Sequence, residues 1–269
     1  MPKHVSIVDV EAMSELRQAG AVVLDARSMR QRGLRFLSGA VRVLWTDTCA
    51  GGQRCGLLAE PSVVAERFAG LGVCWARPVV VVGAGASGWG EGARVAWSLA
   101  WLNHPAVHWL PLFGPPPKGR SGKSIKPSTG WDGTVRDELR APNGTDIPDG
   151  SVVVDVRSPT EQAGARRYGE ARGGHIPGAR FVTMESLWSA SGMTHPDRVR
   201  ALAVNAGIPL DGDLVCVCTG GVRSAAAALM LEAAAVGRTI RNHDGGMWAW
   251  SADRSRPMQC RPSLGSKPS

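Results

Sequence analysis

Short runs of apolar, mostly β-branched residues alternate along this chain with longer segments in which the apolar residues recur at helical spacing. The clearest runs each end at an aspartate or at a glycine-rich segment, and they lie at residues 22–24, 79–82, 152–154 and 214–217. Such short, uniformly apolar runs are typical of strands in a parallel sheet whose faces are covered by helices. Residues 224–236 form the strongest helix candidate, because they are rich in Ala and Leu and begin with a serine that can cap a helix. The pattern predicts an α/β fold.

The two halves of the chain repeat one another. VVLDARS at residues 22–28 returns as VVVDVRS at residues 152–158, and LSGAVRV at 37–43 is followed in the second half by IPGARFV at 176–182. A repeat of this length indicates two tandem domains, each a parallel sheet flanked by helices. We expect a first domain at residues 1–114 and a second domain at residues 146–256. A linker rich in Pro, Gly and Ser at 115–145 connects them, and a flexible tail follows at 257–269.

The charge balance favours anionic partners but does not indicate a nucleic-acid surface. The formal net charge is +8 and the isoelectric point is near 9.7. Many of the basic residues lie in the linker and the tail, and the ten Trp are scattered rather than interleaved with them. Solvated flexible segments explain this pattern better than a nucleic-acid site. The basic residues concerned are Lys118, Arg120, Lys123, Lys126, Arg254, Arg256, Arg261 and Lys267.

The six cysteines show neither the paired spacing of a zinc site nor a disulfide framework. Reduced thiols in a cytosol fit this usage best. The N-terminal residues lack the apolar core of a signal peptide, and no stretch of about 18 apolar residues could span a membrane. We therefore expect a cytoplasmic protein with no membrane partner, no metal and no organic cofactor.

Cys218 is the strongest candidate for chemistry. In LVCVCTGGVRS, at residues 214–224, it ends a buried strand and precedes a glycine-rich turn and a helix N-terminus. Unpaired backbone N–H groups and the positive end of the helix dipole favour a thiolate there, so a catalytic nucleophile is favoured over an inert buried thiol. Cys216, two residues earlier, should pack in the core. The residues expected to cradle the anion are Thr219, Gly220, Gly221, Val222, Arg223 and Ser224.

At these residues the chain resembles the rhodanese family of sulfurtransferases, specifically its tandem two-domain form. Four motifs of the second half carry the resemblance in order: DVRS at 155–158, GHIPGA at 174–179, CTGGVR at 218–223 and DGGMWAW at 244–250. The resemblance implies an enzyme whose Cys218 thiolate takes sulfur from a small anionic donor, holds it as a persulfide, and passes it to a thiol, cyanide or biosynthetic acceptor. A noncatalytic binding or regulatory module is the alternative.

The family resemblance also bears on the donor. Arg223 follows Cys218 by five positions, whereas the phosphatase members of this fold have a longer loop, so sulfur suits the loop better than phosphate. Mercaptopyruvate-type members carry a loop serine and a first-domain histidine, but this chain has Gly220 and, at 37–40, LSGA. Thiosulfate or a related sulfane donor is therefore preferred, with a 3-mercaptopyruvate sulfurtransferase as the alternative.

The first half lacks the nucleophile. Where the repeat would place a second cysteine, residues 83–88 read GAGASG. This matches the GxGxxG dinucleotide fingerprint, but after Glu91 no acidic residue occurs until Asp132, so the required acidic partner about 20 residues on is missing. A degenerate sulfurtransferase loop in a noncatalytic domain is favoured.

Several polar residues of the second half are predicted to support the site. Arg166, Arg167 and Arg172 precede His175 in a segment that contributes anion-binding arginines in tandem relatives, and a solvated basic loop is the equal alternative. Asp155 and Arg157 are expected to tie a strand end to the active loop. His175 and the segment 244–250 are expected to be structural.

Overall fold

The structure is a computed structural model that describes residues 4–32, 37–51, 56–114, 130–189, 192–193 and 195–260. The expected basic residues of the linker and the end of the tail lie outside these ranges. None of the described helices is long and apolar enough to cross a membrane.

The first domain is built on a five-stranded parallel sheet with the order β1-β5-β4-β2-β3. Its strands are β1 (Ser6–Ile7), β2 (Val22–Asp25), β3 (Val41–Arg42), β4 (Val79–Ala84) and β5 (Val107–Leu112). Its helices are α1 (Val10–Gln18), α2 (Met29–Arg32), α3 (Pro61–Gly70) and α4 (Glu91–Trp101), with a short 3-10 helix at Trp45–Thr48. β4 is buried along its whole length, as its unbroken apolar run predicts.

The second domain has a four-stranded parallel sheet with the order β11-β10-β6-β7. Its strands are β6 (Val152–Asp155), β7 (Arg180–Phe181), β10 (Asp213–Val217) and β11 (Thr239–Asn242). In addition, β8 (Trp188–Ser189) pairs antiparallel with β9 (Gly192–Met193). Its helices are α5 (Pro159–Gln162), α6 (Pro196–Asn205), α7 (Val222–Ala233) and α8 (Gly246–Ala252), and short 3-10 helices lie at Asp137–Leu139, Pro142–Gly144 and Met184–Leu187.

The two sheets have the same strand order, apart from the additional strand β1. β2 and β6 carry the two copies of the Asp-x-Arg-Ser sequence, and the strands that pair with them, β4 and β10, lead into the glycine-rich segments. The predicted α/β class, with two parallel sheets flanked by helices, is confirmed. Cys216 lies on β10 with none of its surface exposed, as expected.

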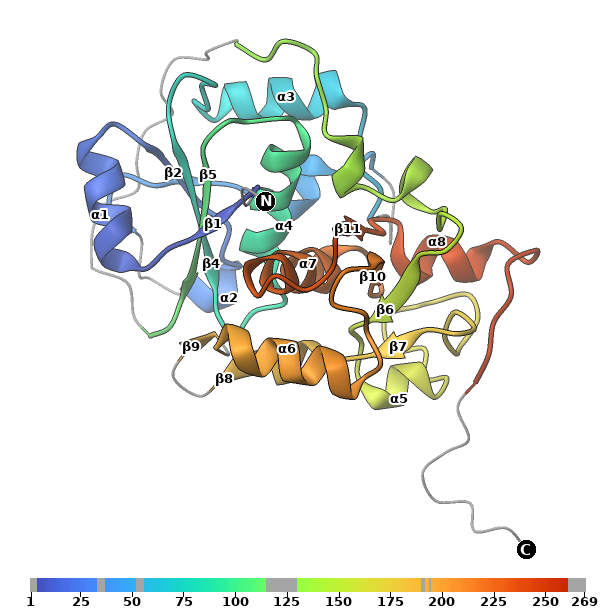
Figure 1. The fold of residues 1–269 in the computed structure, drawn as a ribbon. Helices are drawn as coiled ribbons and strands as arrows, with labels where there is room; N and C mark the ends of the chain where they lie inside the picture. The colour runs from blue at the N-terminus through green and yellow to red at the C-terminus, as the bar shows by residue number, and fades with distance from the viewer. Residues whose placement is uncertain are drawn as a thin grey trace, which may run out of the picture.

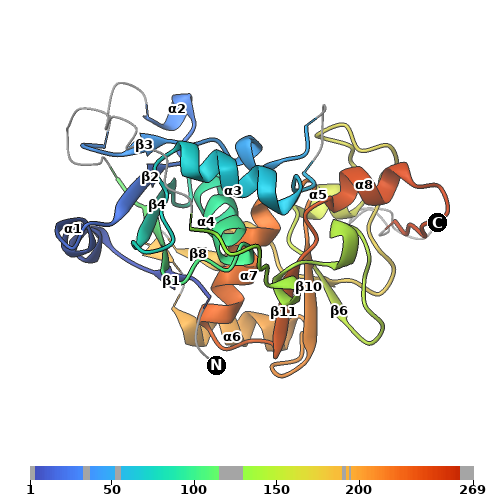
Figure 2. The ribbon, with the colours of Figure 1, turned by 90° about the horizontal axis from the view of Figure 1, so that it is seen from above.

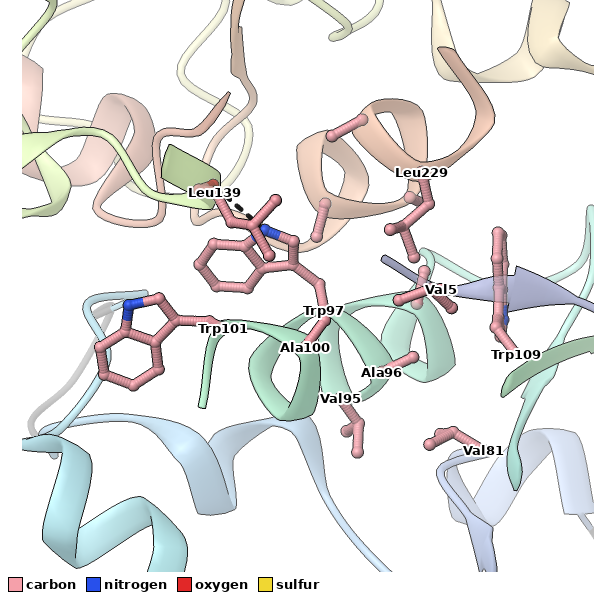
Figure 3. Close-up of a cluster of buried hydrophobic side chains, with 14 of the residues drawn as sticks. Val5, Val81, Val95, Ala96, Trp97, Ala100, Trp101, Trp109, Leu139 and Leu229 are labelled. Carbon is pink, nitrogen blue, oxygen red and sulfur yellow. Dashed lines mark hydrogen bonds between the residues drawn. The ribbon is translucent and has the colours of Figure 1, made fainter. Parts of the chain in front are cut away.

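Helices α4 and α7 lie side by side between the two sheets (Figure 1, Figure 2). One apolar core runs through both domains across this contact. Figure 3 shows Leu139 of the second half against the indole of Trp97 of α4, whose Nε1 donates to the Leu139 carbonyl at 3.2 Å. A core shared in this way fixes the relative position of the two domains, because separating them would expose several large apolar side chains.

The ends of the expected linker and tail are packed rather than flexible. Within the linker, Leu139 and Ala141 are buried, and Arg136 donates to the Asn103 side chain of the first domain at 2.7 Å. At the start of the tail, Gln259 pairs with the backbone of His175 in an isolated bridge. These segments read as polar and Pro-rich, but backbone pairing and a few apolar anchors hold them in place.

Candidate active site

The segment between β10 and α7 forms a tight loop with Cys218 at its start. Cys218 is 1% exposed, and α7 begins at Val222 with Gly221 as its N-cap. Ser224, predicted as the cap, therefore lies inside the helix. The sequence pattern missed this start because Gly221 adopts a left-handed backbone, with φ of 76°, that ends the loop without a side-chain cap.

Both loop glycines are required by their surroundings. A Cβ atom on Gly221 would lie 2.5 Å from the Asp244 carbonyl oxygen, in addition to the strain of its positive φ. A Cβ atom on Gly220 would lie 2.3 Å from the ring of Trp248. Trp248 therefore leaves no room for a serine side chain at position 220 in this chain.

The loop leaves its amide donors available for an anion. The carbonyl groups of Cys218 and Thr219 accept hydrogen bonds from the N–H groups of Met247 and Trp248, at 2.9 and 3.0 Å. By contrast, no residue in the described ranges accepts from the N–H groups of Thr219, Gly220 or Gly221. These donors and the N-terminus of α7 together suit a negatively charged sulfur at Cys218.

A hydrogen-bond chain fixes which group faces the Cys218 sulfur. Ser224 Oγ lies 3.3 Å from Cys218 Sγ and 2.6 Å from Asn242 Oδ1. Asn242 Nδ2 donates to the Gly221 carbonyl at 3.0 Å, so its Oδ1 must face Ser224 as an acceptor. A hydroxyl carries a single hydrogen, so Ser224 can donate to only one of these two atoms at a time, and the shorter contact is the one to Asn242.

Arg223 is held by a carboxylate rather than left free for a donor. Its guanidinium donates to both oxygens of Glu161 at 2.9 and 2.7 Å, and also to the hydroxyl of Thr219 at 2.9 Å. Burial alone would raise the pKa of Glu161, but the hydrogen bonds and the charge of Arg223 lower it to about 2. Likewise, burial would lower the pKa of Arg223, but Glu161 and the charge of Cys218 raise it. The pair is therefore ionised at neutral pH and its charges largely cancel.

Aromatic side chains from both domains line a cavity next to the loop. A cavity of about 230 Å³ contains Cys218 and is lined by Trp45 and Trp89 of the first domain and by Tyr168 and Trp248 of the second. Trp89 is 45% exposed and meets Tyr168 edge to face, with ring centroids 5.0 Å apart. Glu91 also lines this cavity, and its carboxylate accepts from the Trp89 N–H at 2.8 Å. We call this space the aromatic chamber.

A second, more polar cavity of about 240 Å³ adjoins the aromatic chamber. The two share Trp89, Tyr168 and Arg223, and the second one also contains Arg167. Residues 86–88 of the GAGASG segment line it. This glycine-rich segment of the first domain therefore faces the second domain across the polar cavity.

The structure separates the three predicted arginines. Arg167 lines the polar cavity next to the aromatic chamber. The guanidinium of Arg166 donates to the Glu170 carbonyl at 2.6 Å. Arg172 instead donates to backbone carbonyls of the C-terminal segment, at Trp250, Ser251, Asp253 and Arg256. These contacts hold the C-terminal segment in place. Arg172 therefore binds that segment rather than a sulfur donor.

Asp155 and Arg157 form a buried ion pair at 2.6 Å. Arg157 also donates to the Gly174 carbonyl at 2.8 Å, so the pair ties β6 to the GHIPGA segment and not directly to the cysteine loop. His175 is structural as expected, since its Nδ1 lies 2.9 Å from the Gln162 carbonyl. Asp244, in the last motif, joins the domains by accepting from the Leu58 N–H at 2.8 Å and from Arg140 at 3.0 Å.

Sequence reasoning missed Glu161 and the aromatic chamber. A signal for Glu161 was present, because Ser158 and Glu161 have the spacing of a capping box and form one at the start of α5. For Trp45 and Trp89 there was none, since their place beside Cys218 depends on how the two domains pack.

The second half of the chain matches a known family. Residues 136–253 match the rhodanese-like domain. Over 106 residues the chain is 31% identical to the sulfur carrier protein TtuD of Thermus thermophilus, an alignment that covers 36% of this chain and 37% of that protein. The matched part therefore spans little more than a third of that relative.

Solved structures extend the likeness to nearly the whole chain. The 3-mercaptopyruvate sulfurtransferase from Leishmania major superposes with a TM-score of 0.73 at 18% identity, covering 90% of this chain and 73% of that one. The anaerobic ergothioneine biosynthesis enzyme from Chlorobium limicola, in complex with trimethyl histidine, gives 0.75 at 18% identity, covering 94% and 70%. At these identities the structural matches show the fold. Residues 136–253 thus match the rhodanese-like domain, and over the rest of the chain the likeness is one of fold.

Proposed function

We propose that this protein is a sulfurtransferase in which Cys218 takes a sulfane sulfur from a small donor, carries it as a persulfide and delivers it to a nucleophilic acceptor. The observation that carries the proposal is the loop itself. Cys218 directly follows the buried strand β10, beside loop amides that donate to no described residue and close to the N-terminus of α7. The activities named for the sulfur carrier protein and the mercaptopyruvate enzyme support the same chemistry.

The proposed reaction has two displacement steps. The Cys218 thiolate attacks the outer sulfur of a donor such as thiosulfate, the S–S bond of the donor breaks, and sulfite leaves with the bonding electron pair. The acceptor, a thiolate or cyanide, then attacks the outer sulfur of the persulfide, and Cys218 leaves as a thiolate. Loop amides and the N-terminus of α7 stabilise the negative sulfur in both steps. No metal or organic cofactor takes part in this scheme.

Intact mass spectrometry tests the covalent step. After incubation with thiosulfate, the wild-type protein should gain the mass of one sulfur atom, and cyanide should remove it. The Cys218→Ala variant should gain nothing, whereas Cys216→Ala should behave as the wild type, because Cys216 is fully buried on β10. If thiosulfate, mercaptopyruvate and inorganic polysulfide all leave the mass unchanged, the noncatalytic binding module becomes the better account.

The aromatic chamber favours a second, more specific candidate, in which the acceptor is a flat organic ring that carries a positive charge. Four aromatic side chains surround the approach to Cys218, and such rings bind flat molecules and quaternary ammonium groups. The charge of Arg223 is offset by Glu161, and Glu91 adds a carboxylate, so the chamber does not select for a dianion. The enzyme from Chlorobium limicola, solved with trimethyl histidine, supports an acceptor of this kind.

Sulfur transfer to such a ring balances without an oxidant. A ring C–H bond and the S–S bond of the persulfide break, a C–S bond forms, and the proton goes to the Cys218 sulfur. We expect the preformed persulfide to be discharged by trimethyl histidine about tenfold faster or more than by histidine, which lacks the quaternary ammonium group. Mass spectrometry of the protein after timed quenching measures this, and Trp89→Leu should abolish the preference while Trp131→Leu should keep it. Equal discharge by both compounds would contradict the candidate acceptor but not the persulfide.

A further inference from the structure

Arg94 is a fully buried arginine that the first domain directs at the catalytic loop. It lies on α4 and none of its surface is exposed. Its Nη1 donates to the Gly221 carbonyl at 3.2 Å, and its Nη2 donates to the Gly56 carbonyl at 2.6 Å. Its guanidinium also lies 5.1 Å from the ring centroid of Trp97. Arg94 thus connects the domain without a nucleophile to the last residue of the loop that begins at Cys218.

No carboxylate within the described ranges forms an ion pair with Arg94, and its Nε donates to no partner there. The other buried arginines differ in this respect, because Arg27, Arg157 and Arg223 are each paired with an aspartate or glutamate. A guanidinium stays charged at every accessible pH, and burying it without a counter-charge is costly. The free-energy cost of burying the Arg94 guanidinium falls if an anion lies at the loop that Arg94 contacts. A thiolate or persulfide at Cys218 is such an anion.

The contact with Gly221 also has a geometric consequence. In a trans peptide the carbonyl oxygen and the following N–H point in opposite directions. Arg94 and the side-chain amide of Asn242 both donate to the Gly221 carbonyl, at 3.2 and 3.0 Å, and so hold it on the side of α4 and β11. The N–H of Val222 must then point in the opposite direction within the same peptide plane, away from Arg94 and Asn242. Two donors on one carbonyl therefore fix the orientation of the last amide of the loop.

We propose that Arg94 of the first domain is a positioning residue of the loop that begins at Cys218. Its hydrogen bond fixes the Gly221–Val222 peptide, and its positive charge favours the ionised Cys218 sulfur. This assignment rests on the proposed function only in naming the anion that the charge serves. It gives the first domain a role in the chemistry, although that domain has no cysteine at the equivalent position.

The pH dependence of Cys218 alkylation tests the proposal. Iodoacetamide reacts with the thiolate, so the rate of adduct formation at Cys218, followed by mass spectrometry from pH 5 to 10, reports how readily the sulfur ionises in the full-length protein. In Arg94→Met the midpoint of this profile should rise by about half a pH unit or more, as the loss of one nearby charge implies. In Arg94→Lys the shift should be smaller, because the charge remains but cannot reach both carbonyls. Arg136→Met, which removes a contact between the same two halves away from the loop, should leave the midpoint unchanged.

The outcomes separate this proposal from the proposed function. Alkylation needs neither donor nor acceptor, so it reports on Arg94 even if no sulfur transfer is found. A folded Arg94→Met variant with the wild-type profile would overturn the proposal, and so would a shift of equal size in Arg136→Met. If Arg94→Met does not fold, Arg94→Gln provides the same comparison, because it also lacks the charge and has a different, polar side chain.

Discussion

A variant with serine in place of Cys218 should fold as the wild type does and transfer sulfur about a thousandfold more slowly, or not at all. The side chain is 1% exposed and serine is nearly isosteric with it, so the loop and its contact with Ser224 can persist. A serine hydroxyl, however, stays protonated at neutral pH and cannot form a persulfide. Steady-state production of thiocyanate from thiosulfate and cyanide measures the loss.

Cys216 provides a matched control on the same strand. Burial raises the pKa of its thiol to about 12, and the charge of Cys218 adds to the rise, so Cys216 is a protonated core residue at neutral pH. We expect Cys216→Ala to keep the wild-type turnover within about threefold and to lose about 1 kcal/mol of unfolding free energy through the small cavity it leaves. Equal losses of turnover in both variants would show that the nucleophile had been misassigned.

The sequence was sufficient to predict where Cys218 lies, between a buried strand and a helix N-terminus, because every feature that places it is local. A buried strand, two glycines and an Ala-rich helix follow one another within residues 214–233, and each is set by residue type and spacing. The repeat likewise predicted both sheets. The helix start was wrong by two residues, because the left-handed conformation at Gly221 replaces the side-chain cap that Ser224 seemed to offer.

The residues that shape the space around Cys218 could not be predicted in this way. Trp45, Trp89 and Arg94 come from the first domain, and their distance from the loop depends on the packing of α4 against α7. Contacts between residues far apart in the chain produce no periodic pattern of residue types, so a single sequence does not reveal them. The arginines before His175 show the same limit of prediction from one sequence. The three look equivalent in the sequence, but in the structure Arg172 donates to backbone carbonyls of the C-terminal segment, whereas Arg167 lines a cavity.

The ion pair of Glu161 and Arg223 should make stability depend on pH below neutrality. Because the pKa of Glu161 is lowered to about 2 in the folded protein, against an ordinary value of 4.5, the folded state favours the ionised carboxylate. The resulting contribution to the free energy of unfolding, about 3 kcal/mol, is fully present above pH 4.5 and is lost as the pH falls through 2.

Glu161→Gln should remove this pH-dependent contribution and leave Arg223 buried without its counter-charge, at a cost of about 3 kcal/mol of unfolding free energy at pH 7. Urea unfolding should show the gap between wild type and Glu161→Gln narrowing by about 2 kcal/mol between pH 7 and pH 3. Glu185→Gln, an exposed neighbour at the polar cavity, should stay within about 0.5 kcal/mol of the wild type throughout, and a gap that does not change with pH would contradict the ionised pair.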